Sequence, residues 1–441
     1  MINRSKKIIA IFGDVFILYL SLYLTLLLRY GSDFDYLVWQ DHFAPFTIVY
    51  LAWIFIFYLA GLYNQKIAKN NYQFYSILLK AVTIGAFFAI GIFYLTTTFL
   101  ISPKTNLAIN ILIFLILFIL WRQIYNRFIK LSALTSKVLF IGQNKEVDLI
   151  LNILKENPQF GYKAIPLLLD SESNIKDIIE KEKVNVIVHA KDTNSEKNFA
   201  GLLYSLLPLG ITVYDLPKFF SEITRKIPVS IIGRTWFLEN LLEVEKGIYE
   251  VAKRSMDILF TVCLGILTLP LFPFIILAIN LGSRGGAFYT QTRVGKNGKI
   301  FYVLKFRTMV RDAEKLGVQW TKNKDTRVTK IGAFLRKTRI DELPQLWNVL
   351  KGDLSFIGPR PERPEFVETL EKEIPHYQIR HLVRPGLTGW AQINQPFGNA
   401  SIEDSLEKLQ YDLYYIKNRS LIIDLDILAK TIMVVLKREG H

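Results

Sequence analysis

The sequence predicts a membrane protein in three parts: a four-helix transmembrane domain over residues 1–135, an α/β domain over 136–250, and a third domain over 251–441. Composition supports this, because 51% of the 441 residues are hydrophobic although the formal net charge is +15. The charge is unevenly placed, since the three parts carry +7, −2 and +10 in that order. A chain this apolar is not disordered, and one cysteine excludes a disulfide scaffold. The excess positive charge indicates an anionic partner, which is nucleic acid, anionic lipid or a phosphorylated substrate.

The first part contains four apolar stretches, each long enough to cross about 30 Å of hydrocarbon, which takes roughly 20 residues. The only charge within them is Asp14, which we interpret as a snorkelling or helix-packing residue in preference to part of an ion pathway. Basic residues precede the first stretch, lie between the second and third, and follow the fourth, so both ends of the domain are expected in the cytoplasm. The stretches are Ile8–Leu28, Phe43–Tyr63, Ala81–Ile101 and Thr105–Trp121, and the flanking basic residues are Arg4, Lys6, Lys7, Lys66, Lys69, Arg122, Arg127 and Lys130.

Buried-strand patterns alternate with helical patterns in the second part, which predicts a parallel sheet. A dinucleotide site is the obvious hypothesis for such a domain. However, the turn after the first strand, Gly142-Gln-Asn-Lys145, lacks the further glycines that let a backbone approach a pyrophosphate. We therefore expect a structural or dimerising domain, and a homodimeric protein. The strand patterns cover residues 137–142, 184–190 and 211–216, and the helical patterns lie near 146–156, 175–183 and 196–207.

The third part opens with another apolar run, Ile258–Leu281, which Pro270 and Pro273 interrupt. An internal proline removes a backbone hydrogen bond and kinks a helix. Basic residues lie on both sides of the run, so a segment that crossed the bilayer would place the most basic domain outside. The sequence therefore predicts a re-entrant helix over about 256–281 that enters and leaves by the cytoplasmic face, in preference to a buried core helix.

Basic residues are dense after this run, because residues 282–340 hold 15 basic and 3 acidic side chains. That density alone would fit contact with anionic lipid. The next stretch adds two adjacent carboxylates, Asp341 and Glu342, and a proline-framed turn with Arg360 and Arg363. Arginine donates two parallel hydrogen bonds to phosphate, and paired carboxylates beside phosphate suit Mg²⁺. An aspartate can also attack phosphorus to form an acyl phosphate.

Six motifs follow one another in the third part: Lys253-Arg254-x-x-Asp257, Gln291-Thr-Arg-Val-Gly-Lys-Asn-Gly298, Lys305-Phe-Arg-Thr-Met309, Arg336–Asp353, Gly358-Pro-Arg-Pro361 and Arg384–Gln392. Over about 190 residues they resemble the bacterial sugar transferase family, the polyprenyl-phosphate hexose-1-phosphate transferases. The whole chain is similar to the long members, whose four membrane helices and degenerate Rossmann-like domain precede a mainly α catalytic domain. Gly285-Gly286 replaces the usual Gly-Pro, which predicts a looser exit from the re-entrant segment.

The resemblance implies transfer of sugar-1-phosphate from a UDP-sugar to undecaprenyl phosphate, with release of UMP, at the cytoplasmic face of the bacterial inner membrane. The product would start an exopolysaccharide, capsule or O-antigen type of glycan. The resemblance also implies that Asp341 attacks the β-phosphate and forms a covalent intermediate. It further implies that Glu342, with Asp341, binds Mg²⁺. The residues expected to bind substrate, as a group, are Lys305, Arg307, Arg339, Arg360, Arg384 and Gln392.

Several alternatives stay open at this stage. Lys305 and Arg307 could contact lipid headgroups, and Arg384 and Gln392 could serve a structural turn. The stretch Ser420–Lys437 could lie on the membrane surface as an amphipathic helix or pack on the catalytic domain.

Two other functions are compatible with parts of the sequence. A nucleotide-sugar dehydratase needs a Tyr-x-x-x-Lys pair, and Tyr249 and Lys253 have that spacing without the required glycine-rich turn. A non-catalytic membrane sensor would release no UMP. Nucleic acid is excluded as a partner, because the basic residues accompany membrane segments and a phosphate-transfer motif.

Overall fold

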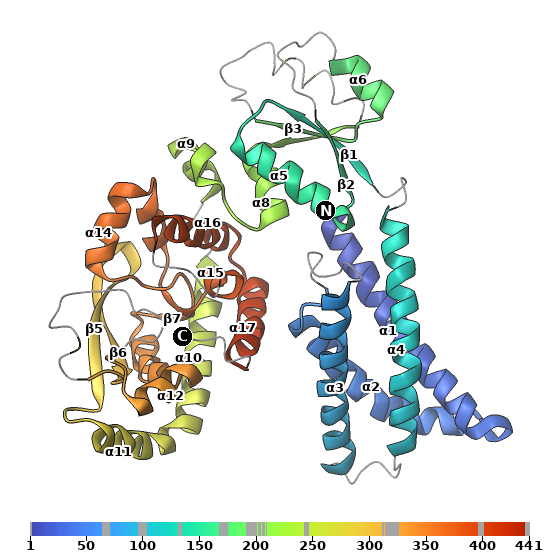
Figure 1. The fold of residues 1–441 in the computed structure, drawn as a ribbon, viewed down its shortest axis with the longest axis horizontal. Helices are drawn as coiled ribbons and strands as arrows, with labels where there is room; N and C mark the ends of the chain where they lie inside the picture. The colour runs from blue at the N-terminus through green and yellow to red at the C-terminus, as the bar shows by residue number, and fades with distance from the viewer. Residues whose placement is uncertain are drawn as a thin grey trace. The chain divides into compact units, whose positions relative to one another are not determined.

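The computed structural model describes residues 2–63, 71–95, 104–130, 135–166, 175–190, 201, 204, 208, 210–241, 247–310, 313, 326–395 and 401–436. The chain divides into two compact units, Met1–Leu216 and Pro217–His441 (Figure 1). Lys66 and Lys69, the end of the third predicted span and most of the predicted helix 196–207 lie outside the described residues. The domain boundaries near residues 135 and 250 stay predictions.

The first unit begins with four long apolar helices. Helix α1 packs along α4, and α2 packs along α3. Their inward faces share one apolar core around Trp53, whereas side chains such as Phe12 are exposed on the outside. Each helix contains a stretch long and apolar enough to cross a membrane, so the prediction of a membrane protein is confirmed. The helices are α1 (Ile2–Tyr30), α2 (Tyr36–Leu59), α3 (Tyr72–Leu95) and α4 (Lys104–Lys130), with a 3-10 turn, η1 (Gly31–Asp33), after α1.

Asp14 is buried between α1 and α4 and has two partners. Its Oδ2 accepts a hydrogen bond from Arg122 Nη2 at 2.6 Å, and its Oδ1 accepts one from Trp121 Nε1 at 3.1 Å. The helix-packing interpretation of Asp14 therefore agrees with the structure. Arg122 was expected in the basic flank after the fourth stretch, but it lies inside the bundle because α4 continues past Trp121.

A four-stranded parallel sheet follows, with the strand order β2-β1-β3-β4. The turn after β1 contains Gly142 with a φ of 92°, and Asn144 then caps α5 by accepting a hydrogen bond from the amide of Val147 at 2.9 Å. The predicted α/β region with a parallel sheet is confirmed, although β2, with its short and mixed sequence, was not predicted. The elements are β1 (Ser136–Ile141), α5 (Lys145–Glu156), η3 (Pro158–Phe160), β2 (Tyr162–Pro166), α6 (Ile175–Glu182), β3 (Val186–His189) and β4 (Thr212–Asp215).

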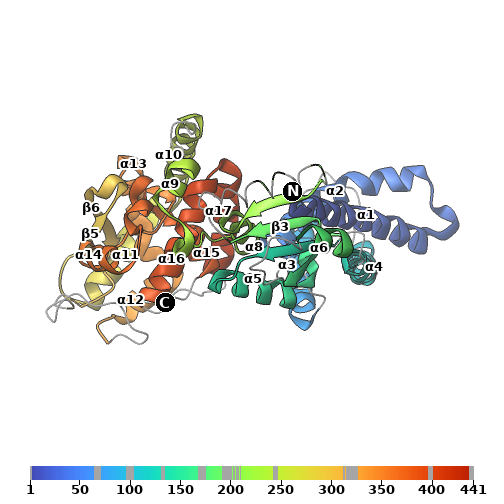
Figure 2. The same cartoon turned by 90° about the horizontal axis from the view of Figure 1, so that it is seen from above.

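The second unit consists mainly of helices, together with two small two-stranded sheets. Strand β5 (Phe288–Val294) pairs antiparallel with β6 (Ile300–Phe306) across η9 (Lys296–Gly298), and β7 (Ser355–Ile357) pairs in parallel with β8 (Gly386–Thr388). Figures 1 and 2 place the β5–β6 hairpin on one side of this unit and α15, α16 and α17 on the other. The helices are α8 (Leu216–Thr224), η6 (Val229–Ile231), α9 (Arg234–Asn240), α10 (Gly247–Thr268), η8 (Leu269–Leu271), α11 (Phe272–Gly282), α12 (Lys330–Thr338), η10 (Ile340–Gln345), α13 (Leu346–Lys351), α14 (Pro364–Glu373), η11 (Tyr377–Leu382), α15 (Trp390–Asn394), α16 (Ile402–Asn418) and α17 (Leu421–Leu436).

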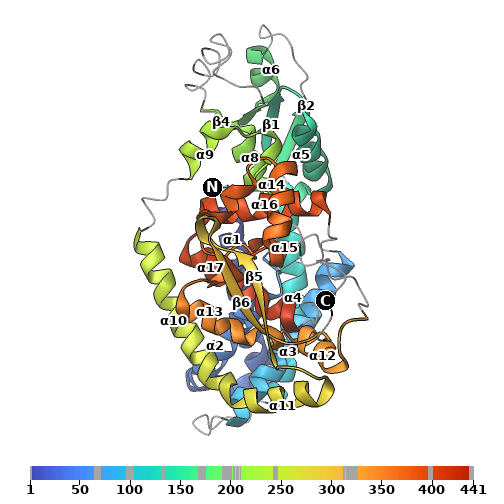
Figure 3. The same cartoon turned by 90° about the vertical axis from the view of Figure 1, so that its left-hand side faces the viewer.

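The predicted break in the apolar run of the second unit is present. Pro270 lies in η8, where the hydrogen-bonded ladder between α10 and α11 is interrupted, and Pro273 lies in the first turn of α11, where proline is tolerated. Figure 3 shows α10 and α11 meeting at a sharp bend. Apolar side chains around the bend, such as Ile266 and Phe274, are more than 70% exposed. This combination of bend and exposed apolar surface agrees with a membrane segment, while its re-entrant course stays a prediction.

Helix α17 packs on the second unit, as one of the two interpretations of this stretch proposed. Asp424 and Ile427 are buried, and the hydroxyl of Thr431 lies 2.7 Å from that of Thr388 on β8. The opposite face exposes Ile422 and Leu425. The helix is therefore part of the core that supports β7 and β8, with an apolar outer face.

Candidate active site

Asp341 and Glu342 lie in η10, directly after α12. The Oγ1 of Thr329 starts α12 by accepting a hydrogen bond from the amide of Gly332 at 2.9 Å. Arg339 ends the helix in the left-handed conformation, with a φ of 59°, which is a common way for a helix to stop. The chain then enters η10, which packs against β6. This local turn brings the carboxylate pair next to the strand that carries Lys305.

Three cationic side chains surround the carboxylate of Glu342. Its Oε1 lies 2.7 Å from Arg360 Nη2, 3.6 Å from Lys305 Nζ and 3.7 Å from Arg339 Nη1. The cations come from three different places: β6, the end of α12 and the loop after β7. Four residues that the sequence analysis selected are thus within one cluster, which we call the Glu342 cluster: Lys305, Arg339, Glu342 and Arg360.

The charges in this cluster determine its protonation states. Burial by itself would raise the pKa of Glu342, but the charges of Arg360 and Lys305 outweigh it and hold that pKa well below its usual range. The Glu342 carboxylate in turn raises the pKa of Arg360. Burial lowers the pKa of Lys305, an effect that Glu342 partly opposes. Glu342 is therefore an anion across the physiological pH range, with its charge engaged by the cluster.

Asp341 is in a different state from its neighbour. It is 7% exposed, and among the described residues its Oδ1 has no hydrogen-bond partner. Burial, together with the charge of Glu342, raises the pKa of Asp341 to about 6, against the opposing effect of Lys305 and Arg339. A buried carboxylate oxygen without a partner is energetically unfavourable. Such an oxygen is available to a substrate atom or a cation, and perturbed groups of this kind gather at functional sites.

Three other predicted substrate-binding residues lie outside the Glu342 cluster. Gln392 donates from Nε2 to the carbonyl of Leu387 at 3.2 Å, a carbonyl that also lies 3.5 Å from Arg360 Nη1. Arg384 leads into β8, and within the described part of the chain its side chain has no hydrogen bond or ion pair. Gln392 and Arg360 therefore contact the same carbonyl oxygen, that of Leu387. These contacts do not bring Arg384 into contact with the carboxylates.

Arg307 fastens the end of α11 to β6. Its Nη2 donates to both the carbonyl and the hydroxyl of Ser283, at 2.9 and 3.0 Å. Gly285 has a φ of 124°, and a Cβ at this position would lie 2.1 Å from Arg307 Nη1. The glycine therefore makes room for the guanidinium. The hydrogen bonds of Arg307 tie the end of α11 to the end of β6, and the expectation of a looser exit from the apolar segment stays a prediction.

A family model for bacterial sugar transferases matches residues 248–438. A UDP-glucose:undecaprenyl-phosphate glucose-1-phosphate transferase from Caulobacter vibrioides is 39% identical over 192 residues, which are 43% of this chain and 72% of that protein. The chain belongs to the bacterial sugar transferase family. The Glu342 cluster, Asp341, Arg307 and Gln392 all lie within the matched residues, so the resemblance of the sequence motifs is confirmed.

Two further relatives differ in coverage and in sugar. This sugar transferase is 43% identical over 234 residues to a UDP-N-acetylgalactosamine-undecaprenyl-phosphate N-acetylgalactosaminephosphotransferase from Aeromonas hydrophila, over 52% of this chain. The chain spans only about half of that relative, 53% of its length. It is 28% identical over 457 residues to a UDP-glucose:undecaprenyl-phosphate glucose-1-phosphate transferase from Klebsiella pneumoniae, covering 98% of this chain and 96% of that one. The relatives thus carry different sugars in their names.

Two arginines near the site were not selected from the sequence. Arg293 on β5 donates to the carbonyl of Pro361 at 2.9 Å and lies 3.5 Å from Glu362 Oε2, so it holds the loop that carries Arg360. Arg336 on α12 donates to the hydroxyl of Thr308 at 2.8 Å, and its charge lowers the pKa of Asp341. Both were within motifs quoted for the family. Their spacing alone did not distinguish them from the other basic residues in a crowded stretch.

The donor set partly fits a magnesium ion. Among the described residues, no group of three or more His, Cys, Asp or Glu side chains could hold a metal. Mg²⁺, however, is commonly held by one or two carboxylates together with substrate phosphates and water. Asp341 Oδ1 is unpartnered and Glu342 is its neighbour, so the two fit an ion that a substrate diphosphate helps to bind. They do not fit a site made by protein alone.

Proposed function

We propose that this sugar transferase moves sugar-1-phosphate from a UDP-sugar to undecaprenyl phosphate and releases UMP. The names of the relatives support this substrate class, since each names undecaprenyl phosphate as a substrate. The observation that carries the proposal is the buried, unpartnered Oδ1 of Asp341 beside a Glu342 that three cations engage. This arrangement provides one free nucleophile within a positive site for a diphosphate.

In the first step, a carboxylate oxygen of Asp341 attacks the β-phosphorus of the donor. The bond between that phosphorus and the bridging oxygen breaks, and UMP leaves with the electron pair. The product on the protein is an acyl phosphate that carries the sugar, as an aspartate nucleophile allows. Since negative charge spreads over several phosphate oxygens during attack, preorganised cations stabilise the transition state. Arg360, Lys305 and Arg339 are placed to supply that charge.

In the second step, an oxygen of undecaprenyl phosphate attacks the same phosphorus. The bond to Asp341 breaks, and the carboxylate leaves with its electron pair, which restores the starting protein. The lipid diphosphosugar is the product that starts a surface glycan. The two steps use one carboxylate and one set of cations. A single site can therefore serve both the water-soluble donor and the lipid acceptor.

A magnesium ion would be held by Asp341 and Glu342 together with the diphosphate, where it would neutralise charge on the phosphate oxygens. The residues of the chain itself have separable roles. Arg360 and Lys305 keep Glu342 charged, and Arg339 and Arg336 favour the charged form of Asp341. Gln392 supports the loop beside Arg360 through the Leu387 carbonyl.

The membrane arrangement is also part of the proposal. The bend between α10 and α11 and the exposed apolar surface around it support a re-entrant segment that enters and leaves by the cytoplasmic face. Basic residues on both sides of this segment favour the same side for the catalytic unit. A bacterial inner membrane then gives access to both substrates. The expected homodimer is checked by light scattering of the protein in detergent.

One alternative function is disfavoured by contacts in the structure. A dehydratase would need Tyr249 and Lys253 free to act on a sugar. Instead, the Tyr249 hydroxyl donates to Asp424 Oδ2 at 2.8 Å, and Lys253 Nζ donates to the same oxygen at 2.9 Å. The spacing of this tyrosine and lysine therefore reflects a structural contact.

The deciding experiment is a UMP-release assay on purified protein with a panel of UDP-sugars. With donor but no undecaprenyl phosphate, the two-step reaction releases up to one UMP per protein, and a peptide containing Asp341 gains the mass of the phosphosugar. With acceptor, release continues. If UMP appears only when both substrates are present, or if Asp341→Asn releases UMP normally, the two-step route is wrong. No UMP from any donor would favour the sensor hypothesis.

A further inference from the structure

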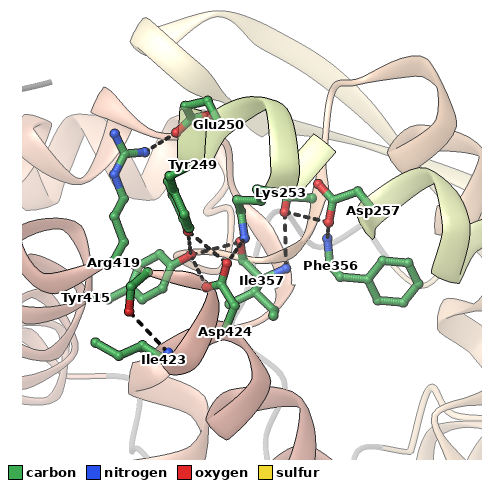
Figure 4. A network of polar contacts seen from close by, with 12 residues as sticks. Tyr249, Glu250, Lys253, Asp257, Phe356, Ile357, Tyr415, Arg419, Ile423 and Asp424 are labelled. Atoms are coloured by element: carbon green, nitrogen blue, oxygen red, sulfur yellow. Dashed lines mark hydrogen bonds and ion pairs between the residues drawn. The ribbon is translucent and has the colours of Figure 1, made fainter. Parts of the chain in front are cut away.

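Three charged residues of α10 bind three different segments of the second unit. They form the motif Lys253-Arg254-x-x-Asp257, one of the six motifs that resemble the sugar transferase family. Figure 4 shows Lys253 and Asp257 on this helix, with the side chains around them. Because α10 continues into the exposed apolar bend, these contacts join the membrane segment to the rest of the unit.

Lys253 binds the C-terminal helix. Its Nζ lies 2.9 Å from Asp424 Oδ2, and both residues are nearly buried. The hydroxyls of Tyr249 and Tyr415 each donate to the same carboxylate at 2.8 Å. Both oxygens of Asp424 are therefore satisfied, as a buried carboxylate requires (Figure 4). This contact holds α10 against α17.

Arg254 binds the end of α13. Its two terminal nitrogens donate to the carbonyls of Val349 and Leu350, each at 2.6 Å. These carbonyls lie in the last turn of α13, where the amide of Gly352 donates to that of Val349 and where the end of a helix attracts cations. Helix α13 follows η10 without interruption. The guanidinium of Arg254 thus fastens the segment that carries Asp341 and Glu342.

Asp257 binds β7. Its Oδ1 accepts a hydrogen bond from the hydroxyl of Ser355 at 3.0 Å. It also accepts one from the amide of Phe356 at 3.0 Å (Figure 4). Strand β7 leads directly to Gly358, and the loop continues to Arg360. A Cβ at Gly358 would lie 2.4 Å from the carbonyl oxygen of Arg384, so this loop has little room to shift. Asp257 therefore fastens the segment that carries Arg360.

We propose that Arg254 and Asp257 are positioning residues that set the distance between the two halves of the active site. They lie on one face of α10, three residues apart, and each holds one of the two segments that meet in the 2.7 Å contact of Glu342 with Arg360. The membrane segment thereby acts as the common support of the catalytic carboxylates and their principal cation. The expected effect on UMP release rests on the proposed function, whereas the expected effect on hydrogen exchange does not.

The test uses the full-length protein in detergent and compares loss of each contact with its conservative replacement. Arg254→Ala and Asp257→Ala remove the contacts, whereas Asp257→Asn keeps an oxygen that can accept from Ser355 and Phe356. Ser255→Ala is the matched control on the same helix, because the exposed hydroxyl of Ser255 donates to the carbonyl of Val251 within α10 itself. Each variant is measured by UMP release and by hydrogen exchange of peptides that cover residues 340–350 and 355–363, without substrate.

We expect the two alanine variants to lower kcat by about tenfold or more, since a displacement of about 1 Å at reacting groups can reduce rates by about 10²-fold. The KM for the donor should change much less, and Asp257→Asn should recover most of the rate. Exchange should rise in both peptide regions, while the unfolding temperature stays close to that of Ser255→Ala.

Two results would overturn the proposal. One is a kcat within about twofold of the control for both alanine variants. The other is a rise in exchange that spreads equally over α16 and α17 with a lower unfolding temperature, which indicates general loosening. If the unmodified protein releases no UMP, the proposed function fails instead, and the exchange of the two peptide regions still decides whether the motif positions them.

Discussion

Each unit contains a carboxylate–arginine contact of nearly the same length, buried in the first unit and half-buried in the second. In the first unit, Asp14 and Arg122 meet at 2.6 Å between α1 and α4. In the second, Glu342 and Arg360 meet at 2.7 Å between η10 and the loop after β7. The first pair is one anion with one cation, and Trp121 satisfies the remaining oxygen of Asp14. The second pair lies in a cluster with two more cations and a second carboxylate.

The difference separates a structural ion pair from the site that we propose for catalysis. The Asp14 pair is one anion with one cation, and each oxygen of its carboxylate accepts a hydrogen bond. The site in the second unit has more cations than carboxylates, and Oδ1 of Asp341 has no partner among the described residues. An excess of positive charge favours binding of an anion, and a buried carboxylate oxygen without a partner beside it favours a reaction with that anion.

Among the variants that test this comparison, Asp341→Asn is expected to have the largest effect on UMP release. The amide keeps the size of the side chain but is a poor nucleophile, so UMP release should fall by on the order of 10⁴-fold. The burst of UMP without acceptor should disappear. The control is Lys372→Ala, which alters an exposed ion pair on α14. A variant at Asp341 with more than about a tenth of normal activity would contradict the assignment.

Asp14→Asn is expected to act on stability alone. Removing one partner of a buried ion pair leaves the other charge uncompensated, which typically costs about 3–5 kcal/mol. Thermal unfolding in detergent should show this loss, while kcat of the folded protein stays unchanged. The double variant Asp14→Leu with Arg122→Met should recover stability, because an apolar pair can replace a buried ion pair. A fall in kcat without a fall in stability would give Asp14 a functional role.

Arg360→Lys tests whether the cation in the Glu342 cluster must be a guanidinium. Lysine keeps the charge but loses the planar fork, and removal of one preorganised donor typically lowers kcat by about 10²-fold. The same substitution at Arg234, at the start of α9, serves as a control outside the site. Equal kcat values for Arg360→Lys and the unmodified protein would show that charge alone is sufficient.

The smallest expected effect is a shift in the pH dependence of kcat/KM in the variant Arg339→Gln. Asp341 must be ionised to attack, and its pKa is raised to about 6. We therefore expect kcat/KM to be low below pH 6, where Asp341 is protonated, and to rise as the pH increases through about 6. Arg339 lowers this pKa, so Arg339→Gln should raise it and move the limb to higher pH by up to about one unit. Lys337→Gln, which neutralises an exposed neighbour on α12, should leave the limb unchanged. A shift to lower pH for Arg339→Gln would contradict the assigned electrostatics.

Much of the molecule could be predicted from the sequence because the signals are local. Apolar runs of sufficient length identify membrane helices without reference to neighbours, and the prolines at 270 and 273 predict the break between α10 and α11. The carboxylate pair and the arginine-bearing turn were also visible, since adjacent residues stay adjacent in the fold. The strand β2 was missed because its five residues carry no clear pattern of their own and depend on pairing with β1.

The sequence by itself determined which residue types are present for phosphate chemistry and which segments are apolar enough for lipid. Only the tertiary structure decided which basic residues serve the site. Lys305, Arg339 and Arg360 meet Glu342, Arg307 ties the end of α11 to the end of β6, and Arg122 pairs with Asp14 inside the first unit. The physical reason is that all basic side chains contribute alike to a charge count, whereas an ion pair depends on distances between segments that are remote in the chain.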